Sequence, residues 1–179
     1  MRSRRSAVRQ VRLVVPLLVA ALAATGVAVS PSTASAQDGH HGATQVTFTK
    51  WVVTQPANPP SFVGVLMTGI VGGSVGEGKY AGTVLGDDLS DPGFWHARAL
   101  YGFFGHQHAF IANLQITEND TTSPATAVLT GVVVAGWRHD ERVRGAYTVM
   151  DPCPIPTPGN VLGSVCFQGS VTLGPARGR

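Results

Sequence analysis

The apolar and polar positions of the chain alternate in short runs between residues 45 and 173. In the first run, Val46 and Phe48 alternate with Thr47 and Thr49, which is the period of a half-buried β-strand. Similar runs follow, separated by clusters of Gly, Pro, Asp and Asn that end strands. The predicted strands span residues 45–53, 62–71, 79–85, 95–104, 108–117, 125–137, 142–150 and 164–173.

The fourth and fifth runs have an ambiguous period. Their apolar residues also fit helical spacing, so the pattern by itself leaves a helix open. Gly102 and Gly105 would each cost about 1 kcal/mol inside a helix, and the neighbouring runs are strands. We therefore predict a hairpin with a three-residue turn over 105–107, in which Phe104 faces His108.

Eight strands with short connections favour a meander, in which each strand pairs with the one before it. A sheet of this size must bury one face, and closing it into a barrel also removes its exposed edges. The sequence thus predicts an all-β domain, an eight-stranded antiparallel up-and-down barrel, with a two-sheet β-sandwich as the alternative. The interior of such a barrel is filled by side chains or holds one small ligand.

The charges of the chain are unevenly distributed. Of 13 Lys and Arg residues, five lie in the first 12 positions, directly before an apolar run over 13–29, and the small residues Ala34 and Ala36 follow. This order of charged, apolar and small residues is typical of a secretory signal peptide. The apolar run falls short of the ~20 residues that span a bilayer, so an uncleaved anchor is the lesser alternative.

Cleavage after Ala36 would leave 143 residues with 8 of the 13 basic and all 10 acidic side chains, so the basic balance belongs to the leader. We expect a signal peptide over 1–36, a flexible arm over 37–44, the barrel over 45–174 and a tail over 175–179. This predicts a secreted, extracellular protein that has no membrane association after cleavage. Nucleic acid is not expected as a partner, because Asp140 and Glu141 interrupt the main basic cluster of the mature chain.

Both cysteines lie in the part that would be exported. Cys153 and Cys166 enclose a loop rich in Pro and Gly, and an oxidising compartment allows a disulfide to persist there. Closing a loop of this size contributes about 3 kcal/mol in the chain-entropy model. We therefore predict a structural disulfide, with free thiols as the alternative.

Three segments carry a family resemblance. The glycine-patterned stretch from Gly69 to Leu85 resembles the strand pair of the allene oxide cyclase-like barrels, and the stretches 127–137 and 143–147 look like closing strands of small exported bacterial proteins in that group. The resemblance, which extends to the dirigent-like proteins, implies an eight-stranded antiparallel barrel with an apolar interior that handles a reactive hydrophobic molecule. It assigns no catalytic residue to a position of this chain.

Several short motifs lack the context that their chemistry needs. The stretch 73–79 approaches a phosphate-binding loop, but Tyr80 stands where Ser or Thr should follow, and the stretch 72–76 matches a nucleophile elbow without its helix. His106 and His108 have a spacing seen in metal sites and form a weak metal candidate. The favoured interpretation is that both are turn histidines in contact with solvent. No cofactor is expected.

The remaining candidate site is the barrel interior, where apolar side chains with a few convergent polar groups would form a ligand pocket. A one-residue change in strand register would exchange the inner and outer faces, so the choice of face stays open. The residues best able to orient a ligand or transfer a proton are His96, Arg98, Asn113, Tyr80, Tyr101 and Tyr147.

Three functions remain open at this point. The first is the binding of a small hydrophobic molecule in the barrel interior, and the second is a cyclase or isomerase that acts on a hydrophobic substrate in the same pocket. The third is a structural or interaction module whose barrel is filled. A void smaller than a few water molecules would exclude the first two, and neither catalytic residues nor the oligomeric state follow from the sequence.

Overall fold

The structure, a computed structural model, describes residues 44–175. The predicted leader and all but the last residue of the predicted arm lie outside this range. No helix occurs in the described part of the chain, and so none there is long and apolar enough to cross a membrane. The hairpin that we predicted over residues 95–117, in place of a helix, is confirmed.

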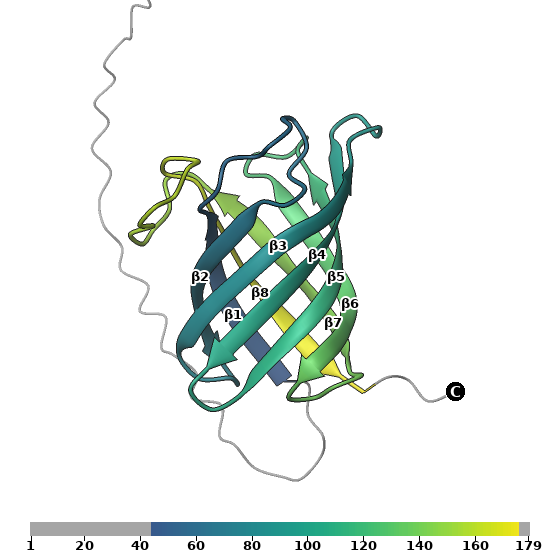
Figure 1. Ribbon diagram of the computed structural model, residues 1–179, viewed down its shortest axis with the longest axis vertical. Helices are drawn as coiled ribbons and strands as arrows, with labels where there is room; N and C mark the ends of the chain where they lie inside the picture. The colour runs from purple at the N-terminus through teal and green to yellow at the C-terminus, as the bar shows by residue number, and fades with distance from the viewer. Residues whose placement is uncertain (1–43, 176–179) are drawn as a thin grey trace, which may run out of the picture. The chain divides into compact units, whose positions relative to one another are not determined.

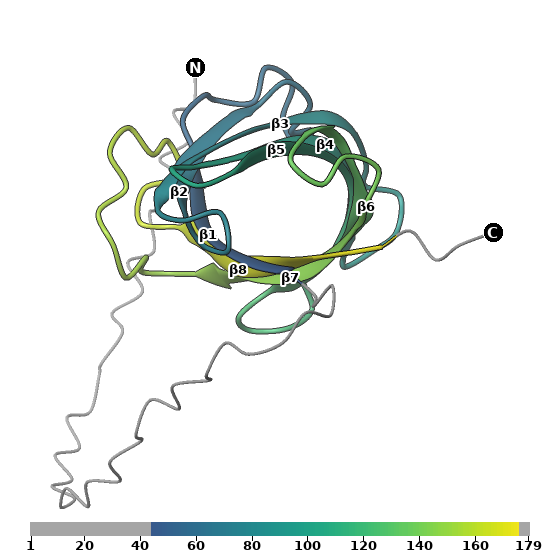
Figure 2. The same cartoon turned by 90° about the horizontal axis from the view of Figure 1, so that it is seen from below.

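Eight antiparallel strands form a closed barrel in which every strand pairs with its neighbours in sequence, and β1 pairs with β8 (Figures 1 and 2). The predicted up-and-down barrel is therefore confirmed, and the sandwich alternative is wrong. The strands are β1 (Thr44–Val52), β2 (Leu66–Gly73), β3 (Gly78–Asp88), β4 (Phe94–Gly105), β5 (Ala109–Asn119), β6 (Thr126–Gly136), β7 (Arg142–Met150) and β8 (Cys166–Gly174).

The barrel has two unlike ends (Figure 1). We call the end with the tight β2–β3, β4–β5 and β6–β7 turns the hairpin end. The opposite end carries the other four connections, two of which are long, and is called the loop end. Those connections are residues 53–65, 89–93, 120–125 and 151–165.

Aromatic rings fill the barrel toward the hairpin end. The Phe103 and Phe110 rings stack with centroids 4.7 Å apart, and Phe48 stacks on Tyr80 at 5.9 Å. Tyr80 also meets Tyr101 edge-on at 5.2 Å. All these residues are at most 3% exposed, so this half of the interior is a packed core.

The β4–β5 turn corrects the predicted register. Phe104 pairs with Ala109 instead of His108, so four residues, not three, connect the last paired positions. The extra residue lets the turn dock on the β2–β3 hairpin, where the N–H groups of Gln107 and His108 donate to the carbonyl of Val75 at 3.0 and 3.2 Å. Gly105 is required at this contact, because a Cβ there would lie 2.0 Å from the Val75 carbonyl oxygen.

The cysteine pair forms the predicted disulfide, Cys153–Cys166, with Cα atoms 5.3 Å apart. It closes the β7–β8 loop, which packs against the outside of β1. The Trp51 indole N–H donates to the Pro158 carbonyl at 3.0 Å, and the Val161 N–H donates to the Val52 carbonyl at 2.9 Å. The loop is therefore joined to the barrel wall at both the disulfide and β1.

Candidate functional site

A cavity of about 200 Å³ lies inside the loop end of the barrel. This is the space of about six or seven waters at ~30 Å³ each, so it exceeds the few waters that would have excluded a ligand. Most of the wall is apolar. Its lining residues are Lys50, Val52, Pro60, Phe62, Val65, Met67, Val84, Leu89, Trp95, Glu118, Asp120, Tyr147 and Phe167.

Lys50 is buried in the barrel wall that borders this cavity. It lies on β1 in step with the inward-facing Phe48 and Val52, and only 2% of it is exposed. Its Nζ donates a hydrogen bond to the hydroxyl of Tyr101. The same nitrogen lies 4.2 Å from the ring centroid of Tyr101.

Two more rings surround the Lys50 amine. Its Nζ lies 4.4 Å from the ring centroid of Tyr147 and 5.1 Å from that of Phe167. Such contacts stabilise an ammonium by about 0.5–2 kcal/mol each. Ion pairs among residues 44–175 do not include Lys50, so aromatic faces and one hydroxyl are its main polar environment.

Burial lowers the pKa of Lys50 from 10.5 to about 7, because the charged form loses its hydration, although the negative charge of Glu118 raises it in part. At neutral pH, Lys50 therefore exists as comparable amounts of ammonium and free amine. A free amine is a nucleophile and a base, so this side chain has chemistry that an exposed lysine lacks at the same pH.

Glu118 and Tyr147 form the second polar pair of the cavity. The Tyr147 hydroxyl donates a hydrogen bond to the Glu118 carboxylate. Burial raises the pKa of Glu118, and Asp120 raises it further through like charge. The cavity thus holds a base whose pKa is lowered and an acid whose pKa is raised, which brings their titration ranges closer together.

Asp87 fixes the 53–65 loop over the cavity. Its carboxylate accepts hydrogen bonds from the Ser61 hydroxyl at 2.8 Å and the Phe62 N–H at 2.7 Å. The Trp95 indole N–H donates to the same carboxylate at 3.4 Å. Phe62 and Trp95 both line the cavity, so one carboxylate positions two of its aromatic walls.

The structure divides the six predicted pocket residues into two groups. Tyr80, Tyr101 and Tyr147 face the interior and are at most 2% exposed. Of these, Tyr147 lines the cavity and Tyr101 reaches it through Lys50, while the buried Tyr80 hydroxyl has no hydrogen-bond partner.

The other three predicted pocket residues, His96, Arg98 and Asn113, lie on the outer face of the barrel. His96 bonds to Asp91 and Thr117 at its surface, and both Arg98 and Asn113 are exposed. The four-residue turn explains the correction, because it pairs Arg98 with Gln115 on the outside and places the Ala97–Ile116 pair inside.

Sequence reasoning missed Lys50 and Glu118. The sequence did contain a signal for Lys50, because this charged residue shares one face of the first strand with the apolar Phe48 and Val52. Glu118 lies just past the predicted strand 108–117, but β5 extends to Asn119, so Glu118 is a strand residue that continues the inward series of Leu114 and Ile116.

His106 and His108 do not converge. The His106 ring bonds to the Glu77 carbonyl at 3.1 Å, whereas His108 stacks on Trp137 with centroids 4.0 Å apart. No group of three or more His, Cys, Asp or Glu side chains suited to a metal ion occurs within residues 44–175.

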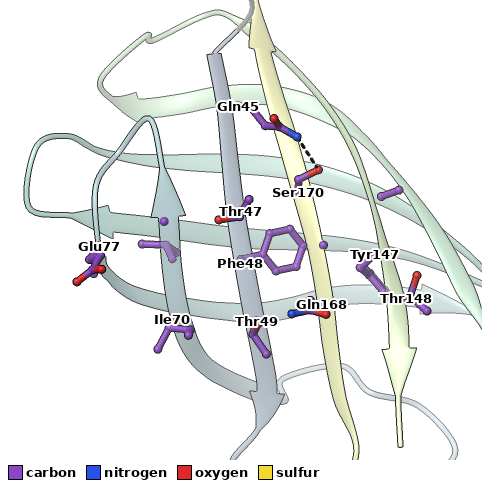
Figure 3. A pocket seen from close by; sticks show the side chains of 15 residues that line it. Gln45, Thr47, Phe48, Thr49, Ile70, Glu77, Tyr147, Thr148, Gln168 and Ser170 are labelled. Atoms are coloured by element: carbon purple, nitrogen blue, oxygen red, sulfur yellow. Dashed lines mark hydrogen bonds between the residues drawn. The ribbon is translucent and has the colours of Figure 1, made fainter. Parts of the chain in front are cut away.

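A larger hollow, about 850 Å³, lies on the outer wall over β7, β8, β1 and β2 (Figure 3). Figure 3 shows short polar side chains such as Thr47 and Ser170 in its lining beside the apolar Ile70, and Gln45 bonds to Ser170 at 3.5 Å. Glu77 is its one ionisable side chain besides the inward Tyr147. The lysine with the lowered pKa and the glutamate with the raised pKa both line the interior cavity, which is therefore the candidate site.

Comparisons of the chain with protein-family models, with curated proteins and with solved structures give no match. The function must accordingly be argued from the geometry of the cavity.

Proposed function

We propose that this protein is an exported binding protein that holds one small hydrophobic molecule in the loop-end cavity. The observation that carries the proposal is the combination of an apolar cavity with three convergent polar side chains, Lys50, Glu118 and Tyr147. Apolar walls with a few placed polar groups are the usual composition of small-molecule sites. The signal-like leader and the disulfide support export.

The cavity also has the means of access that binding requires. Pro60, Leu89 and Asp120 line it and are exposed, so the cavity reaches solvent at the loop end. The packed aromatic core closes the interior toward the hairpin end. A ligand would enter between the loops and stop at the level of Lys50.

The first test is mass spectrometry of the protein purified under native conditions, followed by thermal shift with a panel of small hydrophobic compounds. We expect a co-purified apolar molecule or a stabilising compound. If neither is found, the filled-barrel alternative replaces binding.

A matched pair of variants locates the site. Val65→Phe would fill the cavity, because Val65 is 1% exposed and lines it, whereas the adjacent Leu66 is 50% exposed on the outer face. We expect Val65→Phe to weaken binding at least about 10-fold, about 1.4 kcal/mol, and Leu66→Phe to leave it unchanged. A folded Val65→Phe protein with unchanged affinity would place the ligand elsewhere. If that variant does not fold, Met67→Phe makes the same test.

A second candidate function is a cyclase or isomerase that uses the same cavity, as the resemblance to allene oxide cyclase-like barrels implies. It is favoured by one observation, the presence of an amine with lowered pKa and a carboxyl with raised pKa in one apolar site. Turnover of a bound ligand, abolished by Glu118→Gln, would distinguish this candidate from binding alone.

A further inference from the structure

The chain contains only two lysines, and they occupy opposite environments. Lys79 lies on β3 with its side chain exposed to solvent. Lys50 lies inside the barrel at the wall of the cavity, with its Nζ enclosed by the rings of Tyr101, Tyr147 and Phe167. Only Lys50 could therefore meet a ligand in the cavity.

We infer that the cavity selects small hydrophobic aldehydes or ketones and holds them as an imine on the Nζ of Lys50. This inference rests on the proposed binding function, because it names the class of ligand for the same cavity. The geometry that supports it is a nucleophilic amine at the inner wall of an apolar cavity, with a hydroxyl and a carboxyl group within the same polar cluster.

A hydrophobic carboxylic acid fits the cavity less well. Lys50 would attract its carboxylate, but Asp120 lines the same cavity and repels it, as does Glu118 when it is ionised. A neutral carbonyl compound meets no such repulsion. Since the pKa of Lys50 is about 7, a large share of the side chain is the free amine that attack on a carbonyl requires.

The chemistry balances without any oxidant or reductant. The Nζ lone pair forms a bond to the carbonyl carbon, the C=O π pair moves to oxygen, and one proton passes from nitrogen to oxygen to give a carbinolamine. An acid then protonates the oxygen, the C–O bond breaks to release water, the nitrogen pair completes the C=N bond, and the remaining N–H proton returns to that acid. Amine and carbonyl compound thus give imine and one water.

The surrounding residues can assist both steps. The Tyr101 hydroxyl, which bonds to Nζ, holds the amine in place. Glu118, whose pKa is raised by burial, can supply the proton that the departing water needs, and Tyr147 connects it by a hydrogen bond. The apolar walls slow hydrolysis of the imine because they limit access of bulk water.

The cavity volume limits the ligand to a small molecule. A space of about 200 Å³ is below the ~300–1,000 Å³ of pockets for drug-sized ligands. The aromatic walls Phe62 and Trp95 suit a flat ring. Cinnamaldehyde is a suitable probe, and cinnamyl alcohol has nearly the same shape without the carbonyl group.

The experiment traps the imine by reduction. The purified protein is incubated with cinnamaldehyde and cyanoborohydride near pH 7, and intact mass and peptide mapping locate the added cinnamyl group. We expect one group on Lys50 in the wild type and in Lys79→Met, and at least about 10-fold slower labelling of Lys50→Met. Labelling of Lys79 or the N-terminus at the same rate as Lys50 would overturn the inference.

Cinnamyl alcohol separates failure of this inference from failure of the proposed function. If the alcohol raises the melting temperature of the wild type and of Lys50→Met, while Lys50 is not labelled by the aldehyde, the cavity binds ligands but forms no imine. If neither the probes nor the hydrophobic panel stabilise the protein and Lys50 is unlabelled, both the inference and the binding function are wrong.

Discussion

At the scale of residues, the buried amine of Lys50 is the feature that most affects the electrostatics of the barrel interior. Burial of an ammonium costs several kcal/mol, and the rings of Tyr101, Tyr147 and Phe167 offset only part of this. The remainder is visible as the lowered pKa of Lys50. The side chain therefore destabilises the fold whenever it must be charged.

The stability of the protein should depend on pH through Lys50. Its pKa is about 7 in the folded state and close to 10.5 when unfolded, so the unfolded chain binds more protons between these values. We expect stability to rise with pH from 7 to about 9.5, by up to about 1.4 kcal/mol per pH unit, and Lys50→Met to remove this rise. Urea unfolding at several pH values measures both.

The window of that experiment ends below pH 10, because burial raises the pKa of Tyr80 and Tyr147 and their ionisation in the unfolded chain adds the opposite slope. Glu118 and Tyr101, the other titratable groups that face Lys50, are present in both proteins. Lys79→Met is the control. Parallel curves for the wild type and Lys50→Met would mean that Lys50 does not titrate in this range.

Individual residues also mark the limit of sequence-based prediction. The three tyrosines were identified because they lie in predicted strands and carry hydroxyls that can orient a ligand or transfer a proton. Lys50 was passed over because one charged residue within Val46, Phe48 and Val52 does not break the strand pattern and is easily assigned to solvent. The alternation places Lys50 on the apolar face, but its burial also depends on the closure of the sheet around it.

At the scale of elements, β3 shows how one extra residue repositions a side chain. Tyr80 and Val84 face inward, so simple alternation would turn Asp87 outward. A bulge between Val84 and Gly86 shifts the register, and Asp87 then pairs with the inward-facing Ala97. The bulge therefore places the carboxylate under the 53–65 loop, where Ser61 and Phe62 bind it.

Removal of this carboxylate should loosen the loop. We expect Asp87→Ala to lower stability by about 1–3 kcal/mol, because the Phe62 N–H and the Trp95 indole lose a charged partner. Ligand affinity should fall with it. Asp88→Ala is the matched control, since Asp88 is exposed and accepts only from the Ser90 N–H. Equal effects of the two variants on stability and on Trp fluorescence would show that Asp87 does not anchor the loop.

The β4–β5 hairpin shows why strand positions could be predicted better than strand faces. Alternation and glycine cost identified both strands within one or two residues. The turn length depends on the contact of Gln107 and His108 with Val75, about thirty residues earlier in the chain. A tertiary contact thus added one residue to the turn. As a result Ile116, on the inward face of β5, pairs with Ala97 of β4 and not with His96.

At the scale of the whole molecule, the closed meander follows from properties that the sequence contains. Eight runs of alternating residues with short connections leave few topologies, and closure satisfies both sheet edges through the β1–β8 pairing. The cavity could not be predicted in the same way, since it depends on how far the aromatic rings fill the interior. The rings of Phe48, Tyr80, Phe103 and Phe110 occupy one half of the interior, and the cavity lies in the other half.

The disulfide should stabilise the molecule without being needed for the barrel. Cys153 lies outside the strands, and the bridge to Cys166 closes a loop whose ends are 13 residues apart. Replacement of both cysteines by serine should lower stability by about 3 kcal/mol, with the β-sheet circular dichroism retained. Trp51, bonded to this loop, should become more accessible to a fluorescence quencher. Unchanged unfolding after reduction would contradict this expectation.

The aromatic core closes the hairpin end, so the cavity opens to solvent at the loop end. This fixes the direction in which a ligand would enter. A carbonyl ligand of the kind proposed would have to enter with its carbonyl group first, because Lys50 lies at the inner wall of the cavity. It would leave in the reverse direction. On the proposed function, only the carbonyl end of the ligand would reach Lys50, and any part longer than the cavity would lie among the loops beside Pro60 and Leu89. Those two loops would therefore limit the length of the ligand, while the Lys50 amine would select for a carbonyl group.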